Sequence, residues 1–335
     1  MMTPLTLNLD YLTIGPVQSY RNLALVALLT EQEAQVDYLT LDEALAQKVI
    51  TITETDVAGE VPRLRVINLS DQKVLLLDGE ELVGAKQNRV LNTSILLAPQ
   101  SETLIPVSCI ERGRWSYKSR EFCSPGRTMS AYLRKKKNLS VHFCLRHFGE
   151  FHSNQGEIWE EIETKFAQAR VEPSPTQALS DLYEIQRHSF EEYLPHFNPL
   201  AGQVGFAAHI HGKLAGVEVL GRVATLHRLH GKLVGSYILD ALESAEKTSA
   251  ATPESLAEAT RAFLAEAALA PVERRPSVAL GEDIRVDSTT VIGAGLEFEG
   301  QILQLSLFPR ESSAPAESRT QTLRQASRRR RQLLR

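Results

Sequence analysis

Residues 73–97 of this 335-residue chain read KVLLLDGEELVGAKQNRVLNTSILL, and this stretch sets the expectations for the rest of the fold. An apolar run over 73–77 stops at Asp78, and a second strand candidate covers 89–98. Each run has the length and the flanking turn residues of a β-strand. Between the two lie residues 78–89, the densest group of polar side chains in this part of the chain, which we call the polar segment.

Apolar runs of similar length flank this stretch on both sides. Their spacing of eight to twelve residues is typical of an antiparallel sandwich or a strongly bent sheet. Pro106 lies in one of them, and its missing N–H group predicts a bulge or a sheet edge there. A short helix is expected over 41–48. Strands are expected over 22–29, 64–69, 73–77, 89–98 and 103–110.

The second half of the chain is richer in helical patterns. Apolar residues from Ile158 to Ala169 recur at helical spacing, with Ser153 or Asn154 as the N-terminal cap. Thr252-Pro253 is typical of a helix start, because Thr can cap and Pro suits the first turn. The other expected elements are helices over 176–193, 233–244 and 252–269, a hairpin of 203–210 with 214–220, and strands over 277–308 with turns or bulges at 293–295 and Gly300.

These patterns predict an α+β fold, an antiparallel β-rich sandwich-like core with helices inserted in the second half. We expect a single domain over 1–309. Its parts are a β-rich region over 1–150, a helical region over 155–200, a hairpin and helices over 203–270, and C-terminal strands over 277–308. Residues 310–335 are rich in Arg and poor in apolar groups, which predicts a disordered tail because little burial offsets the entropy of ordering.

Charge is unevenly distributed along the chain, whose formal net charge is −4. Residues 111–147, which we call the basic island, carry ten Lys or Arg against two Glu, and the tail carries eight Arg against two Glu. The remainder is therefore strongly acidic. A basic region in an acidic body attracts anionic partners locally, while the rest of the surface repels them.

Composition excludes several classes of protein. No apolar run is long enough to cross a membrane, and the N-terminus lacks the pattern of a secretory signal. Cys109, Cys123 and Cys144 show no metal-binding or disulfide spacing, which favours a reducing, cytoplasmic setting. The histidines offer no third ligand to a pair such as His209 and His211, so no metal site is expected.

The polar segment poses a problem of burial. If strand pairing is unbroken from Lys86 to Leu97, then Gln87 and Arg89 lie on the same face as the apolar Leu91 and Leu97. An unsatisfied buried polar group costs about 1–3 kcal/mol, and a charge costs more. In one interpretation neighbouring carboxylates pair with Arg89 and the segment only holds a bent loop. In the other, these groups line a pocket for a polar ligand.

The basic island contains interleaved aromatic residues. Arg112-Gly113-Arg114-Trp115 follows a predicted strand, so two guanidinium groups could clamp a phosphate while the indole stacks on a base. The alternative is a solvated loop with its aromatic rings in the core. The run 134–137, Arg-Lys-Lys-Lys, is expected to be a solvated helix face or loop.

Several motifs together resemble a known family. They are Gly79-Glu80-Glu81-Leu82 through Lys86-Gln87-Asn88-Arg89, the strand ending in 105–109, and residues 111–115, with looser matches at 154–159, 202–205 and 236–242. The chain resembles the ARG and rhodanese-phosphatase-superfamily-associated protein domain, where ARG denotes ADP-ribosylglycohydrolase. The similarity spans about 5–309.

The resemblance implies a small anionic, nucleotide-derived ligand such as ADP-ribose, by association with the proteins for which the family is named. Glu80 and Glu81 are then the candidate catalytic acid and base. The candidate ligand-binding residues are Lys86, Gln87, Asn88, Arg89, Arg112, Arg114 and Trp115. The sequence leaves open whether the ligand is transformed, and it identifies no cofactor and no oligomeric state.

Two other functions remain open. The basic island and the tail together could bind nucleic acid through phosphate contacts, with an affinity that falls steeply with salt. Alternatively, the domain is a non-catalytic interaction or scaffold protein, in which the polar segment holds a bent sheet together.

Overall fold

The computed structural model describes residues 6–55, 62–169, 171, 175–243 and 251–310. The protein has an α+β fold with a β-rich core, as the sequence predicts. All of its strand pairs are antiparallel within these residues except one, between β3 and β6. The predicted tail over 310–335 lies outside the described residues apart from Arg310.

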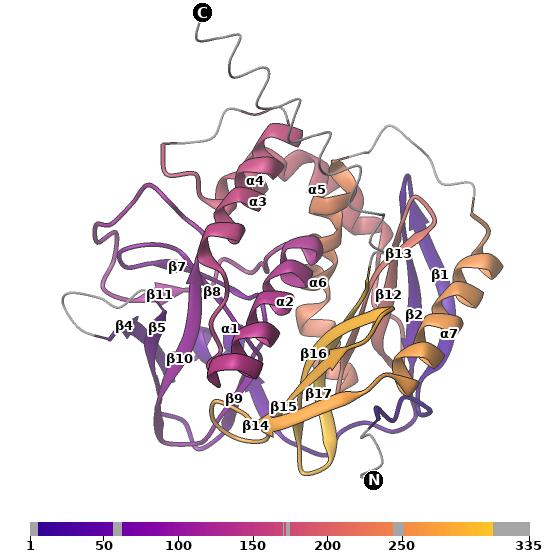
Figure 1. The fold of residues 1–335 in the computed structure, drawn as a ribbon, viewed down its shortest axis with the longest axis horizontal. Helices are drawn as coiled ribbons and strands as arrows, with labels where there is room; N and C mark the ends of the chain where they lie inside the picture. The colour runs from indigo at the N-terminus through magenta and orange to yellow at the C-terminus, as the bar shows by residue number, and fades with distance from the viewer. Residues whose placement is uncertain (1–5, 56–61, 170, 172–174, 244–250, 311–335) are drawn as a thin grey trace, which may run out of the picture.

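The larger sheet has eight strands and joins the two ends of the described chain. Its first strands, β1 and β2, lie along β12 and β13, and the last four strands complete it (Figure 1). In spatial order the strands are β1 (Thr13–Tyr20), β2 (Leu23–Leu29), β12 (Gln203–Ile210), β13 (Lys213–Leu220), β17 (Gln301–Pro309), β16 (Val291–Phe298), β15 (Glu282–Asp287) and β14 (Val272–Pro276).

The second β unit is formed by the chain between β2 and the long helices. A six-stranded sheet contains, in order, β11 (Phe122–Cys123), β7 (Glu81–Gly84), β8 (Arg89–Leu91), β10 (Ser101–Cys109), β5 (Arg63–Asn68) and β4 (Ile50–Glu54). Its two outermost strands, β4 and β11, approach each other, so the sheet curls strongly. A three-stranded sheet of β3 (Tyr38–Thr40), β6 (Lys73–Leu76) and β9 (Ile95–Leu97) packs against it through a shared apolar core.

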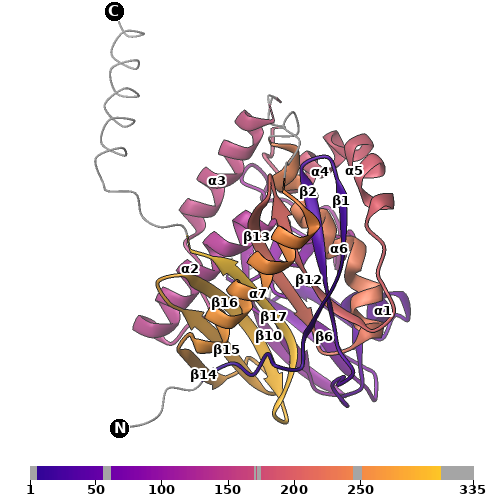
Figure 2. The ribbon, with the colours of Figure 1, turned by 90° about the vertical axis from the view of Figure 1, so that its right-hand side faces the viewer.

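Helices fill the space between the two β units and cover the outer face of the larger sheet. In Figure 1, α2 and α6 lie between the units, while α7 lies on the far face of the eight-stranded sheet, as Figure 2 also shows. The helices are α1 (Leu41–Ala46), α2 (Ala131–Phe148), α3 (Gln155–Gln168), α4 (Leu179–Ile185), α5 (Arg187–Tyr193), the 3-10 turn η1 (Leu194–His196), α6 (Val223–Leu242) and α7 (Pro253–Leu269). None of the described helices is long and apolar enough to cross a membrane.

Most of the expected elements form where the local signal is strong. The predicted caps are confirmed, because Asn154 accepts a hydrogen bond from the backbone of α3 and Thr252 does so for α7. The hairpin of β12 and β13 and the strands over 22–29, 64–69 and 103–110 are also confirmed. Pro106 lies where the pairing of β10 passes from β5 to β8, so its missing N–H interrupts neither ladder.

The unbroken strand over 89–98 is a wrong prediction. β8 ends at Leu91 and β9 begins at Ile95, because the three residues between them bond to other parts of the fold. The hydroxyl of Thr93 donates to Asp283 (2.6 Å), and that of Ser94 donates to Gln304 (2.8 Å). Burial does not alternate either, since every residue from 84 to 97 is buried.

Two smaller predictions are also wrong. The helix expected over 176–193 is divided at Gln186 into α4 and α5. Gly293 and Gly295 are not turn residues but lie inside β16, paired on both sides. A Cβ at Gly293 would lie 2.5 Å from Leu307, so close packing explains this glycine. Gly300, with φ of 74°, does form a turn.

The largest error concerns residues 134–137, which are not a solvated face. They lie in α2, where Arg134, Lys135 and Lys137 are buried, and only Lys136 is partly exposed. Acidic residues of other elements pair with three of these cations: Arg134 with Glu218, Lys136 with Glu161 and Lys137 with Asp78. Much of the basic island is therefore neutralised inside the protein.

Candidate functional site

The side chains of the polar segment diverge toward three different parts of the fold. Glu80 faces α6, where Lys232 donates to its Oε1 atom (2.6 Å) and also lies 2.8 Å from Asp42. The other carboxylate oxygen of Glu80 accepts from the backbone N–H of Leu77 (2.7 Å). Burial raises the pKa of Glu80, while Lys232 opposes the rise. Glu80 thus ties the β6–β7 turn to α6.

Glu81 faces the helical side of β7. Its partner is Arg127, whose Nε lies 3.3 Å from the Glu81 Oε2 atom. Burial raises the pKa of Glu81 to about 7, against the opposing effect of Arg127, and Asp181 and Glu111 add to the rise. Glu81 is thus a buried carboxyl group that titrates near neutral pH.

Asn88 and Arg114 fasten the β7–β8 loop to the segment after β10. Arg114 forms a bidentate pair with Glu111, donating from Nε (2.9 Å) and from Nη2 (2.7 Å). It also donates to the Asn88 side chain (3.1 Å) and to the carbonyl of Ala85 (2.6 Å). Burial favours a higher pKa for Glu111, but Arg114 and the Asn88 N–H lower it overall. The guanidinium of Arg114 is therefore occupied by protein acceptors.

Arg89 is fully buried at the start of β8. Its Nη1 donates to the Gln87 side chain (2.9 Å) and to the sulfur of Cys109 (2.9 Å). Its Nη2 lies 3.9 Å from Glu54, and neither Nη2 nor Nε has a hydrogen-bond partner within the described chain. The guanidinium is thus held in place with part of its bonding capacity unused.

Two aromatic rings cover the cations of the β7–β8 loop. The Nζ atom of Lys86 lies 5.4 Å from the ring centroid of Trp115 and 5.2 Å from that of Tyr117. The guanidinium carbon of Arg89 lies 5.6 Å from the Trp115 ring. Such cation–π contacts orient the rings. Trp115 nevertheless stays 48% exposed, so part of the indole remains available to a ligand.

A cleft of about 660 Å³ opens beside these groups, near the meeting point of β4 and β11. Tyr117 and Glu54 line it and connect it to Lys86 and Arg89. The residues that line the cleft are Thr53, Glu54, Thr55, Arg65, Tyr117, Lys118, Ser119 and Arg120. Its volume is in the range of small-molecule sites.

The charges at the cleft are mainly positive. Arg65, Lys118 and Arg120 line it, with Glu54 as the one acid among its lining residues. Arg65 has an exposed partner in Glu102 at 3.9 Å, a weak contact in water. Cationic walls beside exposed aromatic rings suit an anion that carries a planar group.

The structure brings together only some of the residues that the sequence predicts. Lys86, Gln87, Arg89 and Trp115 converge beside the cleft. Arg112 does not, because its guanidinium lies over the ring of Trp159 on α3, 5.6 Å from the centroid. Glu80, Glu81, Asn88 and Arg114 do not line the cleft and bond to other protein groups.

The sequence does not predict that Glu54, Arg65 and Tyr117 belong to this site. One signal was present for Glu54, because strand periodicity places it on the same face as Ile50 and Ile52. All three of these residues are buried. An acidic residue on the apolar face of a strand indicates that a cation or hydrogen-bond donor from another element lies next to it.

Comparison with known proteins gives one match. The family model of the ARG and Rhodanese-Phosphatase-superfamily-associated Protein domain matches residues 11–308. No curated protein and no solved structure matches the chain. The family match extends from the segment before β1 into β17 and includes the polar segment, the cleft and all the long helices. The chain therefore belongs to the ARG and Rhodanese-Phosphatase-superfamily-associated Protein domain family.

Proposed function

We propose that the cleft beside Trp115 binds a small phosphorylated, nucleotide-derived molecule of the ADP-ribose type. The observation that carries the proposal is the half-exposed indole of Trp115, which lies over the buried Arg89 guanidinium and next to a cleft with mainly cationic walls. The family name adds an association with ADP-ribose chemistry, which is a weaker argument than the geometry.

Each lining group has a role in this proposal. Arg65, Lys118 and Arg120 contact the phosphates. Trp115 and Tyr117 stack on the base, and base stacking on aromatic rings contributes about 1–3 kcal/mol per base. Glu54 accepts hydrogen bonds from ribose hydroxyls. Lys86 and Arg89 lie behind these rings and supply fixed positive charge. Gln87 holds the Arg89 guanidinium in place.

The proposal is for binding and does not assign a reaction. Glu80 and Glu81 are engaged with Lys232 and Arg127 and do not line the cleft, so we give them structural roles in it. If the bound molecule also reacts, Glu54 is the carboxylate that lines the cleft and can take part in the reaction. We also propose a cytoplasmic setting, on the basis of the sparse cysteines.

Calorimetric titration with ADP-ribose tests the proposal. We expect Trp115→Ala and Arg120→Ala each to weaken binding at least tenfold, while both fold normally because the two side chains are exposed. The matched control is Arg261→Ala, which removes an exposed cation from α7 on the other side of the large sheet. Arg89→Ala should abolish the rise in melting temperature that ADP-ribose causes. Equal affinity in the wild type, Trp115→Ala, Arg120→Ala and Arg261→Ala, or no binding to the wild type, overturns the proposal.

A scaffold role is the second candidate, and internal pairing in the polar segment favours it. Glu80, Glu81 and Asn88 all bond to distant elements, as a structural brace would. If this is their whole function, Glu80→Gln and Arg89→Met lower the melting temperature and no nucleotide raises it. The same experiment includes an RNA oligomer at low salt. Tight, salt-sensitive RNA binding favours a nucleic-acid-binding function over both the ADP-ribose site and the scaffold role.

A further inference from the structure

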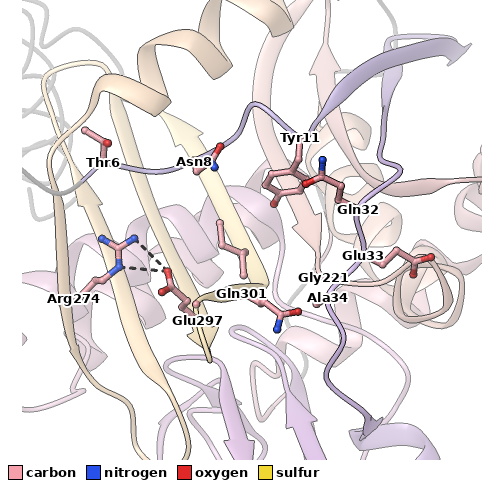
Figure 3. Close-up of a pocket in the computed structure, with 12 residues that line it drawn as sticks. Thr6, Asn8, Tyr11, Gln32, Glu33, Ala34, Gly221, Arg274, Glu297 and Gln301 are labelled. Carbon is pink, nitrogen blue, oxygen red and sulfur yellow. Dashed lines mark hydrogen bonds and ion pairs between the residues drawn. The ribbon is translucent and has the colours of Figure 1, made fainter.

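A second, separate pocket lies at the end of the eight-stranded sheet, where the segment before β1 crosses it (Figure 3). Its volume is about 360 Å³. The side chains around it come from five parts of the chain: Thr6, Asn8 and Tyr11 before β1; Gln32, Glu33 and Ala34 after β2; Gly221 after β13; Arg274 on β14; and Glu297, Gly300, Gln301 and Ile302 around the β16–β17 turn. It shares no lining residue with the cleft.

Several polar groups in this pocket have hydrogen-bonding capacity to spare. The Oε1 atom of Gln301 accepts from the N–H of Gln35 (2.6 Å), which fixes its amide with Nε2 left as a donor. The Oδ1 atom of Asn8 accepts from the N–H of Asp10 (3.1 Å), which likewise leaves Nδ2. The Tyr11 side chain is partly buried at the edge of this pocket. Burial raises the pKa of Tyr11 to about 12, so its hydroxyl stays protonated and can donate as well as accept.

Fixed charges in the pocket do not favour an anion. Arg274 is paired with Glu297, donating to its Oε2 atom from Nη2 (3.2 Å) and Nε (3.4 Å), as the dashed lines in Figure 3 mark. Glu33 adds a second carboxylate, whose Oε2 accepts from the N–H of Val223 at the start of α6 (2.7 Å). The pocket lining thus holds one cation and two carboxylates, with Glu33 at the opposite end of the pocket from Arg274 (Figure 3), and each carboxylate keeps an oxygen that can accept from a hydroxyl group.

We propose that this pocket binds a neutral, hydroxyl-rich small molecule, a pentose or hexose. Carboxylate oxygens of Glu33 and Glu297 accept from sugar hydroxyls, in hydrogen bonds that charge strengthens. The amides of Asn8 and Gln301 donate to sugar oxygens. The Tyr11 ring offers an apolar surface to the C–H groups of the sugar, and its hydroxyl donates to a sugar oxygen. The volume lies at the small end of the range for ligand sites, which suits a single sugar ring.

Saturation-transfer NMR on the full chain, with D-ribose and D-glucose as probes, tests this site. We expect saturable binding of at least one of the two sugars, with a dissociation constant of roughly 1–10 mM, a weak affinity of only a few kcal/mol. Tyr11→Phe removes only the hydroxyl and should weaken binding about fivefold, an effect of about 1 kcal/mol. Gln32→Ala, which removes an exposed amide that lines the pocket, should also weaken it.

The control is Gln72→Ala, which removes an exposed amide in the β5–β6 turn. Binding that falls in Tyr11→Phe and Gln32→Ala, and not in Gln72→Ala, supports the site. No saturable binding of either sugar, or binding that neither variant changes, overturns it. Stronger binding of ribose 5-phosphate than of ribose, with the same loss in Tyr11→Phe, also overturns it, because the charges described here disfavour a phosphate.

Discussion

At the scale of single residues, Glu81 shows how burial shifts the titration of a carboxyl group. It is fully buried, and its ion pair with Arg127 does not offset the loss of hydration, so its pKa rises to about 7. Between pH 4.5 and 7 the folded chain therefore holds a proton that the unfolded chain has lost. The contribution of Glu81 to stability therefore falls as pH rises through this range.

Glu81→Gln removes this titration and gives the first prediction. A shift of this size corresponds to about 3 kcal/mol. We expect the variant to gain stability relative to the wild type by up to about that amount as pH rises from 4.5 to 8. Urea unfolding of both proteins at several pH values measures the difference, and a difference that does not vary with pH contradicts the raised pKa.

At the scale of elements, α2 is held by buried ion pairs in addition to buried apolar residues such as Leu133 and Val141. Arg134 donates to Glu218 on β13 (2.6 Å) and to Ser236 on α6 (2.9 Å). One turn further along, Lys137 pairs with Asp78 and donates to the carbonyl of Asn92 (3.1 Å). The helix thus connects the eight-stranded sheet to the polar segment.

The second prediction compares neighbours on α2. Arg134→Met leaves Glu218 buried without its cation, and breaking a buried pair in this way costs about 3–5 kcal/mol. Lys136→Met removes a partly exposed pair with Glu161 (3.4 Å), which contributes at most about 1 kcal/mol. Chemical denaturation of both variants measures the two losses. Equal losses contradict the burial of Arg134.

The third prediction concerns the β6–β7 turn, which packs against α2. Gly79 has φ of +81°, and a Cβ there would lie 2.4 Å from the Arg134 side chain. Gly126 has a similar φ of +73° but open space around it. Gly126→Ala should therefore cost only about 1–2 kcal/mol of backbone strain, and Gly79→Ala should cost clearly more. Thermal unfolding of Gly79→Ala and Gly126→Ala separates the cost of steric crowding from that of backbone strain. Similar melting temperatures of the two variants contradict the close packing at Gly79.

Local sequence patterns predicted most helices and strands. They failed where contacts between residues far apart in the sequence determine the structure. Capped helices and short apolar strands were predictable because their signals lie within a few residues. The burial of α2 was not predictable, because Arg134 and Lys137 occupy helix positions where a buried face normally has apolar residues. The break after Leu91 was not either, because Thr93 and its partner Asp283 are far apart in sequence.

The candidate site was predictable to a similar extent. An Arg in an apolar context pointed to Arg89, and the aromatic residues of the basic island pointed to Trp115. Their approach to each other depends on the curl of the six-stranded sheet, which no local pattern contains. The same curl brings Glu54 and Tyr117 to the cleft.

At the scale of the whole molecule, the polar segment and the residues up to Ser94 connect both β units. Glu80 reaches α6, while Thr93 and Ser94 reach the strands of the large sheet. These contacts brace the polar segment, whose Lys86 and Arg89 lie beside the cleft. We therefore propose that the cleft is preformed, and that it binds a phosphorylated nucleotide-type ligand beside the exposed Trp115 indole without large rearrangement.

Fluorescence of Trp115 tests that claim most directly. The chain has two tryptophans, so Trp159→Phe leaves Trp115 as the only indole. Titration of this variant with ADP-ribose should change the emission in a saturable way, and more weakly at high salt because screening weakens the phosphate contacts. D-ribose should leave the emission unchanged. Emission that ADP-ribose does not alter, or that ribose alters equally, contradicts the account.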